Sequence, residues 1–344
     1  MNFKDKKVLV IGAGKSGVAV SRFLCGKGAA VVLADAGRPG DPRCVLEQLS
    51  AAGVQILTGG YPGVERASFD LVVLSPGVPL TEKPAREALK HGIPVTGELE
   101  LAYRFARAPI VAVTGTNGKT TTTTLIGEIF KRAGRNVLVG GNIGRPLVTE
   151  VERFGTGDLI VAEVSSFQLE TATTFKPKVG VILNITPDHL DRHGNMENYT
   201  EAKLRIVAGQ DPGDYAVLNY DDAVTAALGK GLRGKVVYFS RQAALTEGVF
   251  VREGKIIARF SRLEEIICRV NELGIPGAHN LENALAAVAA TKVLGVEGGV
   301  LADTLREFKG VSHRLEFVAE IDGVRYINDS KGTNPDASIK ALEA

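Results

Sequence analysis

The residues with the clearest chemical potential lie between an apolar run at 109–113 and a helical pattern that begins near residue 122. This order predicts a strand, a phosphate-binding loop and a helix N-terminus. Glycines let backbone N–H groups turn toward phosphate oxygens, a lysine supplies positive charge, and a threonine hydroxyl can hold Mg²⁺. We therefore predict that a nucleoside triphosphate binds here. The residues that would contact it are Gly115, Thr116, Asn117, Gly118, Lys119, Thr120 and Thr121.

This loop departs from the strict pattern G-x-x-x-x-G-K-[ST], because Val113 stands where the first glycine is expected. We interpret the loop as a tighter variant of the same device. A glycine-rich turn with a surface lysine is the alternative interpretation. The strand predicted before the loop and the helix predicted after it favour phosphate binding.

An acidic residue and a histidine follow two further predicted strands. Glu163 lies at the end of the strand predicted at 158–164, where a carboxylate is well placed to hold Mg²⁺. An acid that caps the following helix is the alternative. His189 comes shortly after the strand predicted at 179–183. We expect its ring to face the same cleft as the phosphate loop.

The N-terminal region predicts a Rossmann-type unit. A strand at 7–11 leads into the turn Gly12-Ala13-Gly14-Lys15-Ser16-Gly17, and a second strand at 30–34 ends at Asp35. That acid is close to the position expected about 20 residues after such a turn. A third strand at 70–74 runs into a turn at 75–79. The glycines alone leave NAD and a nucleotide-sugar diphosphate both open, because each would place its phosphates at the helix N-terminus.

Beyond residue 97 the predicted strands at 109–113, 136–139, 158–164, 179–183 and 215–218 alternate with helical segments. Such alternation is typical of a mostly parallel sheet. We predict an α/β protein with an N-terminal Rossmann-like domain at 1–97, a central P-loop ATPase-type α/β domain at 98–309, and the start of a third α/β domain at 310–344. This last stretch is too short to fold alone, so we expect a truncated third domain.

Composition narrows the class of protein. The chain has 344 residues, 44% of them hydrophobic, and a formal net charge of +2. This length allows two or three domains, and the balanced charge gives no signature of nucleic-acid or membrane binding. The three cysteines form no C-x-x-C pair, which argues against structural zinc and a disulfide scaffold. With no signal peptide and no long apolar run, we expect a cytoplasmic protein.

Four motifs together resemble the Mur ligase family: GTNGKTT at 115–121, EVSSFQLE at 163–170, HNLEN at 279–283 and NDSKGTN at 328–334. The strings SSFQLE and NDSK are similar to those of the branch that adds D-glutamate to UDP-N-acetylmuramoyl-L-alanine. The resemblance implies an ATP-dependent ligase of peptidoglycan precursor synthesis. ATP would phosphorylate a substrate carboxylate, and the amino group of D-glutamate would attack the acyl phosphate to form an amide.

The resemblance also implies two Mg²⁺ ions. Thr120 and Glu163 would hold one, and His189 and Lys203 the other, with Lys203 as a carbamate. Sequence alone would place Lys203 on a helix surface. A bare ammonium group would be repelled by Mg²⁺, whereas a carbamate turns the side chain into an anionic oxygen ligand. The implied catalytic residues are Lys119, Glu163, His189 and Lys203.

Further contacts follow from the same resemblance. Asn280 and Asn283, one helical turn apart, would contact the nucleotide, although a pair of interhelix hydrogen bonds is the alternative. Ala36 stands where related enzymes can carry a hydroxyl residue, which leaves the uracil contact open. Arg314 and Asp329 would clamp the ATP phosphates and ribose. The implied substrate contacts are Ser16, Asp35 and Gly77 for UDP, Asn142 for the muramoyl-alanine end, Lys331 and Thr333 for D-glutamate, and Ser165 for the substrate in general.

Three other functions stay open from the sequence. An NAD-dependent oxidoreductase would use the first glycine turn. It would give no function to Lys119, Glu163 or the pair Asn280 and Asn283. A folate-glutamylating ligase would share the ATP loop, but the N-terminal unit argues against it. A binding fragment without turnover would follow from truncation. We expect a monomer whose partners are small-molecule substrates.

Overall fold

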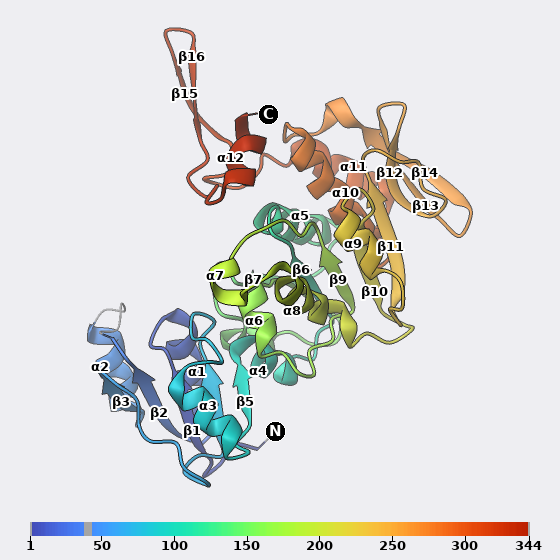
Figure 1. Ribbon diagram of the computed structural model, residues 1–344. Coiled ribbons are helices and arrows are strands. Elements are labelled where there is room, and N and C mark those ends of the chain that lie inside the picture. The colour runs from blue at the N-terminus through green and yellow to red at the C-terminus, as the bar shows by residue number, and fades with distance from the viewer. Residues whose placement is uncertain (1, 38–42, 343–344) are drawn as a thin grey trace. The chain divides into compact units, whose positions relative to one another are not determined.

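The computed structural model describes residues 2–37 and 43–342 (Figure 1). Its contacts group the chain into two compact units, each with its own sheet. The first unit comprises Met1–Ala108, Gly140–Thr156 and Ser165–Phe175, and the second comprises Pro109–Val139, Gly157–Val164 and Lys176–Ala344. The domain limits predicted at residues 97 and 310 do not coincide with this grouping and stay predictions.

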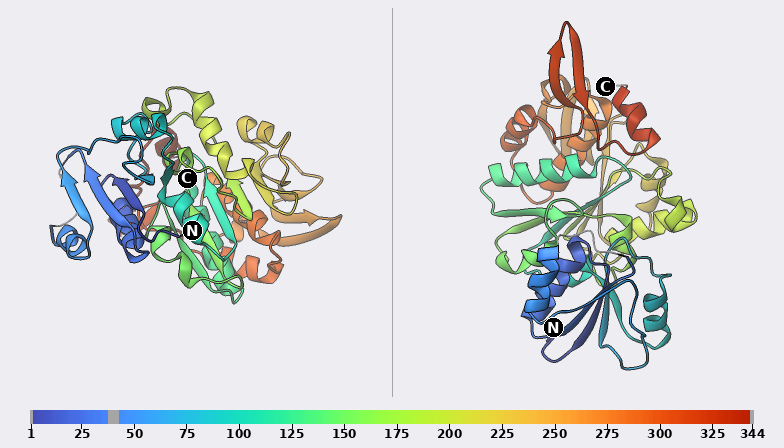
Figure 2. Two further views of the ribbon diagram at one scale, coloured as in Figure 1. Left: turned by 90° about the horizontal axis from the view of Figure 1, so that it is seen from below. Right: turned by 90° about the vertical axis from the view of Figure 1, so that its left-hand side faces the viewer.

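The first unit contains a five-stranded parallel sheet in the order β3-β2-β1-β4-β5. Helices α1 and α2 lie on one face of this sheet and α3 on the other (Figure 2). This arrangement confirms the Rossmann-like prediction and its three strands, whereas β3 and β5 were not predicted. The elements are β1 (Lys7–Ile11), α1 (Lys15–Gly26), β2 (Ala30–Asp35), α2 (Arg43–Ala51), β3 (Gln55–Thr58), β4 (Leu71–Leu74), α3 (Lys83–Lys90), β5 (Val95–Gly97) and α4 (Glu98–Phe105).

Strand order reverses between β1 and β4, and the turns after these two strands therefore meet at the switch point where such sheets bind ligands. The hydroxyl of Ser75, just after β4, donates a 2.8 Å hydrogen bond to the carbonyl oxygen of Gly12, just after β1. A Cβ atom at Gly17 would lie 1.8 Å from the same oxygen. Only glycine lets α1 approach the turn this closely.

The second unit contains a nine-stranded sheet in the order β14-β13-β12-β11-β10-β9-β6-β8-β7. Strands β8, β6, β9, β10, β11 and β12 pair in parallel, which confirms the mostly parallel prediction, and β12, β13 and β14 form an antiparallel extension. The strands are β6 (Ile110–Thr114), β7 (Val137–Gly141), β8 (Leu159–Glu163), β9 (Val179–Ile182), β10 (Tyr215–Asn219), β11 (Lys235–Ser240), β12 (Gly248–Arg252), β13 (Lys255–Phe260) and β14 (Leu263–Arg269).

Helices α5 (Lys119–Arg132) and α10 (Ala278–Lys292) pack on this sheet and on each other. Alanine is the commonest residue at the buried positions of α10, and its small side chain permits this close contact. Five further helices lie between or after the strands in the sequence. These are α6 (Ser166–Glu170), α7 (Leu190–His193), α8 (Met196–Ala208), α9 (Ala223–Leu228) and α11 (Gly298–Glu307), with 3₁₀ turns at Leu147–Thr149, Val151–Arg153 and Val270–Glu272.

The C-terminal region consists of the hairpin β15 (Glu316–Ile321) and β16 (Val324–Asn328), followed by α12 (Pro335–Leu342). The helix begins at Pro335. Several apolar side chains of the hairpin are exposed, among them Phe317 and Ile327. Across the described residues, every helix is too short or too polar to cross a membrane.

Glu98, the first residue of α4, is an acid buried inside the first unit. Its Oε1 atom accepts a 2.8 Å hydrogen bond from the backbone N–H of Val148. Its Oε2 atom has no hydrogen-bond partner among the described residues. Burial raises the pKa of Glu98 to about 7, so the folded chain favours the protonated carboxyl group.

We expect Glu98→Gln to stabilise the chain at pH 8. Because the folded pKa lies above the ordinary value of 4.5, the stabilising contribution of Glu98 falls as pH rises from about 4.5 to about 7 and stays low above it. Glutamine is neutral throughout and keeps an oxygen for the N–H of Val148. Thermal unfolding at pH 5 and pH 8 should show a smaller pH dependence in the variant, with a gain at pH 8 of up to ~3 kcal/mol.

The exposed Glu128→Gln provides the control, because Glu128 lies on the surface of α5 in an ion pair with Lys131. Its unfolding should follow the wild-type pH dependence. A Glu98→Gln variant with an unchanged pH slope would show that Glu98 is ionised in the folded chain at neutral pH.

Candidate nucleotide and substrate sites

The predicted phosphate loop lies between the end of β6 at Thr114 and the start of α5 at Lys119. Gly118 is the N-cap of α5 and has a left-handed φ of 84°. A Cβ atom at this position would lie 2.2 Å from Oδ1 of Asn283 on α10. Both the backbone conformation and the lack of space require glycine. The sequence prediction of strand, loop and helix is confirmed.

Lys119 folds over the loop from the first position of α5. Its Nζ atom donates hydrogen bonds to the carbonyl oxygens of Gly115, at 3.0 Å, and Thr116, at 2.7 Å. Burial lowers the pKa of Lys119, and the nearby charge of Glu163 opposes this effect. The lysine thus adds its charge to a helix N-terminus, which already favours anions.

Thr120 and Glu163 form the second feature of the loop. The hydroxyl of Thr120 donates a 2.7 Å hydrogen bond to Oε2 of Glu163, and both residues are buried. A hydroxyl and a carboxylate are the oxygen ligands that Mg²⁺ prefers, so this pair fits the donor set expected for that ion. Across residues 2–37 and 43–342, no group of three or more His, Cys, Asp or Glu side chains could hold a metal ion.

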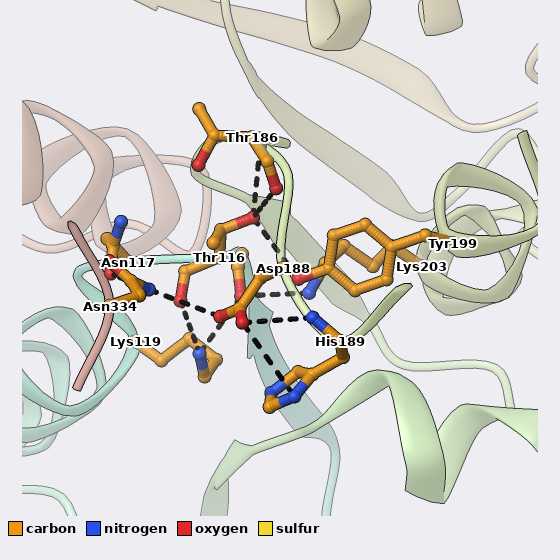
Figure 3. Close-up of polar contacts among 10 residues, drawn as sticks. Thr116, Asn117, Lys119, Thr186, Asp188, His189, Tyr199, Lys203 and Asn334 are labelled. Carbon is orange, nitrogen blue, oxygen red and sulfur yellow. Dashed lines mark hydrogen bonds and ion pairs between the residues drawn. The ribbon is translucent and has the colours of Figure 1, made fainter. Parts of the chain in front are cut away.

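Lys203 lies in α8, and the structure corrects the expectation from sequence alone that it is a surface lysine. Its side chain is buried, and its Nζ atom donates a 2.8 Å hydrogen bond to the carbonyl oxygen of Gly115 (Figure 3). The same atom lies 4.6 Å from the ring centroid of Tyr199. Burial, reinforced by the charge of Lys119, lowers the pKa of Lys203 well below its ordinary value.

His189 follows β9 and has a left-handed backbone, with φ of 52°. The preceding Asp188 accepts a 2.9 Å hydrogen bond from the backbone N–H of His189, and the same carboxylate oxygen lies 3.8 Å from its Nδ1 atom. The charge of Asp188 raises the pKa values of Lys119 and Lys203, against the effect of burial. The structure therefore brings this turn close to both lysines, as Figure 3 shows.

A cavity beside the loop is lined by residues from three parts of the second unit. The phosphate loop, α10 and the C-terminal region each contribute to its lining. Of the predicted nucleotide contacts, Gly115, Thr116, Lys119 and Thr120 are not part of the lining. The predicted contacts that line it are Asn117, Gly118, Thr121, Asn280, Asn283, Arg314 and Asp329.

The two asparagines of α10 also have structural partners. Asn283 Oδ1 accepts a 3.2 Å hydrogen bond from the hydroxyl of Thr122 on α5, and its amide nitrogen donates to Oδ1 of Asn280. Asn280 donates in turn to the carbonyl oxygen of Pro276, at 2.7 Å. The alternative interpretation of an interhelix hydrogen bond is therefore confirmed for Asn283, while both asparagines also line the cavity.

The predicted uridine contacts belong to the switch-point region of the first unit. Asp35 lies at the end of β2, Ser16 in the first turn of α1, and Gly77 in the turn after β4. The carboxylate of Asp35 accepts hydrogen bonds from the backbone N–H of Ala13, at 2.7 Å, and of Gly37, at 2.9 Å. Asp35 thus holds the glycine turn in place through its side chain.

The remaining predicted substrate contacts lie in three different segments of the chain. Asn142 follows β7, and Ser165 is the N-cap of α6, where its hydroxyl accepts a 3.3 Å hydrogen bond from the N–H of Gln168. Lys331 and Thr333 are exposed in the segment between β16 and α12. The structure does not by itself assign a ligand to any of these four residues.

Several residues around the loop had no role in the sequence prediction. The hydroxyl of Tyr199 lies 3.2 Å from that of Thr116, and burial raises the pKa of Tyr199 to about 12. Asn184 Oδ1 accepts a 2.9 Å hydrogen bond from the N–H of Asn117. Asp188 and Asn334 also lie beside the phosphate loop. Each of these residues lies beside or within a sequence motif, and that position was the signal in the sequence that could have identified it.

Two family models match the chain. The Mur ligase middle domain matches residues 113–291, and the N-terminal domain described as Mur ligase MurD-like matches residues 6–97. A curated UDP-N-acetylmuramoylalanine–D-glutamate ligase of Pelotomaculum thermopropionicum is 70% identical over 343 residues, which cover 100% of this chain and 75% of the relative. The ligase of the same name from Caldanaerobacter subterraneus is 49% identical, with coverage of 100% and 76%.

Solved structures show the same fold at lower identity. MurF from Acinetobacter baumannii has a TM-score of 0.59 and 20% identity, covering 90% of this chain and 67% of its own. The UDP-N-acetylmuramate-alanine ligase MurC from Thermotoga maritima has a TM-score of 0.57 and 23% identity, with coverage of 98% and 76%. The family models and the identity to curated ligases over the whole chain show that this chain belongs to the Mur ligase family.

Proposed function

We propose that this chain is an ATP-dependent ligase that joins D-glutamate to UDP-N-acetylmuramoyl-L-alanine in peptidoglycan precursor synthesis. The 70% identity to the Pelotomaculum thermopropionicum ligase over the whole chain is the observation that carries this proposal. The geometry of the phosphate loop supports the nucleotide part of it. Because ATP is made and used in the cytoplasm, we propose that the reaction takes place there.

The reaction needs no protein nucleophile. ATP transfers its γ-phosphoryl group to the substrate carboxylate, the amine of D-glutamate attacks the resulting acyl phosphate, and phosphate leaves as the amide forms. The chain's contribution is to position the reactants and to offset negative charge. Lys119 and the N–H groups at the start of α5 supply positive potential at the phosphates.

We further propose that Thr120 and Glu163 hold Mg²⁺, because their oxygens are buried and adjacent at the loop. A bound Mg²⁺ would neutralise phosphate charge. His189 and Lys203 are the proposed ligands of a second ion. The position of Lys203 at the loop supports its inclusion, since its Nζ atom reaches the carbonyl oxygen of Gly115.

Lys203 is proposed to act as a carbamate. Burial and the charge of Lys119 favour its neutral amine, which is the form that adds to CO₂. The nitrogen forms a bond to the carbon of CO₂ and loses a proton, which leaves an anionic carbamate. This change replaces an unfavourable buried ammonium next to Lys119 with an anion that can offset positive charge.

The remaining residues are assigned to the nucleotide and to the substrates, and these assignments are also proposals. The cavity residues Asn280, Asn283, Arg314 and Asp329 are assigned to the adenine nucleotide. The switch-point turns with Ser16, Asp35 and Gly77 would hold UDP, because a helix N-terminus at a glycine turn binds diphosphates. Asn142 is assigned to the muramoyl-alanine end, Lys331 and Thr333 to D-glutamate, and Ser165 to the substrate in general.

We expect Lys119→Ala to abolish ATP binding, because the loop loses its positive charge and the bonds that hold it closed. Calorimetric titration with ATP would measure this. Lys131→Ala is the matched control, since Lys131 lies on the same helix in an exposed ion pair with Glu128, and should bind ATP as the wild type does. An unchanged ATP affinity in Lys119→Ala would refute the assignment of the phosphate loop.

Asp35→Ala should weaken binding of UDP-N-acetylmuramoyl-L-alanine and leave ATP affinity unchanged. The variant loses the acceptor for the N–H groups of Ala13 and Gly37, so the glycine turn is no longer held. Hydrogen bonds to charged groups contribute about 1.5–3 kcal/mol, which corresponds to roughly a ten- to hundredfold loss. Asp70→Ala, which removes an exposed ion pair with Lys6 in the same unit, serves as the control. Equal affinities in both variants would contradict the assigned site.

The function itself is tested by titrating the 344-residue chain with UDP-N-acetylmuramoyl-L-alanine, with UDP-glucose and NAD as controls. We expect selective binding of the muramoyl nucleotide. ADP release in the presence of ATP and Mg²⁺ should then require D-glutamate and not L-glutamate. Binding of NAD in preference to the muramoyl nucleotide would reject the ligase in favour of an oxidoreductase.

A further inference from the structure

Asn334 connects the C-terminal region to the phosphate loop. Its Nδ2 atom lies 3.2 Å from Oδ1 of Asn117 and 3.1 Å from Oδ2 of Asp188 (Figure 3). A side-chain amide nitrogen carries two hydrogens, so both bonds can form at once. The acceptor on Asp188 is an oxygen of its side-chain carboxyl group, so the two bonds join Asn334 to two different residues.

The two partners of Asn334 belong to loops that are already joined. Asn117 exchanges two hydrogen bonds with Asn184, one from its N–H to Oδ1 at 2.9 Å and one from the amide of Asn184 to its carbonyl oxygen at 3.2 Å. The other carboxylate oxygen of Asp188 accepts the N–H of His189. Asn334 therefore bonds to the phosphate loop and to the turn after β9, which form one connected assembly.

The segment that carries Asn334 also carries the proposed contacts of two reactants. Asp329, which lines the nucleotide cavity, lies five positions before it, and Lys331 and Thr333 lie between the two. Two other hydrogen bonds of this segment stay within the C-terminal region. The N–H of Leu315 donates to Oδ1 of Asp329, and the N–H of Lys331 donates to the carbonyl oxygen of His313. The bonds of Asn334, in contrast, reach the loop.

We propose that Asn334 is a positioning residue that couples the segment at 329–342 to the phosphate loop. Nucleotide bound at the loop and at Asp329 would stabilise the seated position, in which Asn334 contacts Asn117 and Asp188. The seated segment in turn fixes Lys331 and Thr333 relative to the loop. This inference rests on the proposed function only in naming D-glutamate as the reactant that these two residues meet. Coupling of this kind must be reciprocal between the two ligands.

Hydrogen exchange measured by mass spectrometry tests the coupling in the 344-residue chain. The probe is a non-hydrolysable ATP analogue with Mg²⁺, and the readout is the exchange of peptides that cover residues 324–342. In the wild type, the analogue should slow this exchange. In Asn334→Ala, the slowing should fall by roughly tenfold, because two hydrogen bonds worth about 1 kcal/mol or more are lost. By the same linkage, affinity for the analogue should fall by no more than the factor by which the coupling falls, which is roughly tenfold.

Asn328→Ala provides the matched control. The amide of Asn328 lies 2.8 Å from Nδ1 of His313, so its contacts stay within the C-terminal region. Its removal alters the hairpin without touching the loop, and the analogue should still slow exchange in this variant. The proposal is overturned if Asn334→Ala responds to the analogue as the wild type does, or if Asn328→Ala loses the response equally.

Exchanging the side-chain types at positions 334 and 188 distinguishes a loss of coupling from a loss of fold. Asn334→Asp places a second carboxylate opposite Asp188, and repulsion should make exchange faster than in Asn334→Ala at the same pH. Adding Asp188→Asn restores an amide opposite a carboxylate, with the roles reversed, and should slow exchange again. A double variant that exchanges as fast as Asn334→Asp would contradict the proposal.

The outcome is independent of substrate identity. If the chain fails to bind UDP-N-acetylmuramoyl-L-alanine, the proposed function fails, but the exchange data with the ATP analogue still decide the role of Asn334. If the chain binds the muramoyl nucleotide and the variants show no loss of coupling, the ligase assignment stands and the role of Asn334 is rejected.

Discussion

The buried Lys203 and the half-buried Lys119 meet at one backbone oxygen, and we propose that the chemistry of the second unit depends on this arrangement. Lys119 and Lys203 both donate to the carbonyl oxygen of Gly115, at 3.0 and 2.8 Å. Burial lowers the pKa of Lys203, and repulsion by the charge of Lys119 lowers it further. An anionic ligand relieves this repulsion from one side, and a carbamate on Lys203 would relieve it from the other. The folded chain therefore has an electrostatic preference for bound anions before any ligand arrives.

The position of Lys119 depends in turn on close packing between helices α5 and α10. Gly118 leaves room for Asn283 of α10, and Asn283 accepts a hydrogen bond from Thr122 of α5. The alanine-rich face of α10 allows α5 to approach, which fixes the N-terminus of α5 beneath the loop. A larger residue at Gly118 would force Asn283 away and so disturb the loop and the nucleotide cavity together. The glycine signal in the sequence reflects this contact as well as the need to bind phosphate.

Local features of the sequence were sufficient for the core elements but not for contacts between distant residues. The strands before Gly12 and before the phosphate loop are short apolar runs followed by glycine turns, and both were predicted because strand and turn signals are local. Lys203 was expected on the surface because lysine is rarely buried. Its burial depends on which face of α8 packs on the loop, and the pattern of α8 alone does not reveal this. Asn334 contacts a residue 217 positions away, and no local pattern predicts such a pair.

The two units have different sheets but share one feature after the first strand. In each unit, the first strand ends at a glycine turn, and the following helix presents its N-terminus there: Gly12 before α1, and Gly118 before α5. A reaction that consumes ATP and acts on a UDP-linked substrate needs two separate sites for nucleotide phosphates, and the proposed function assigns one to each turn. Both helices begin with a lysine, Lys15 in α1 and Lys119 in α5. The turns differ in how they are held, because Lys119 donates to the carbonyl oxygens of its own loop, whereas the first turn is held by the carboxylate of Asp35.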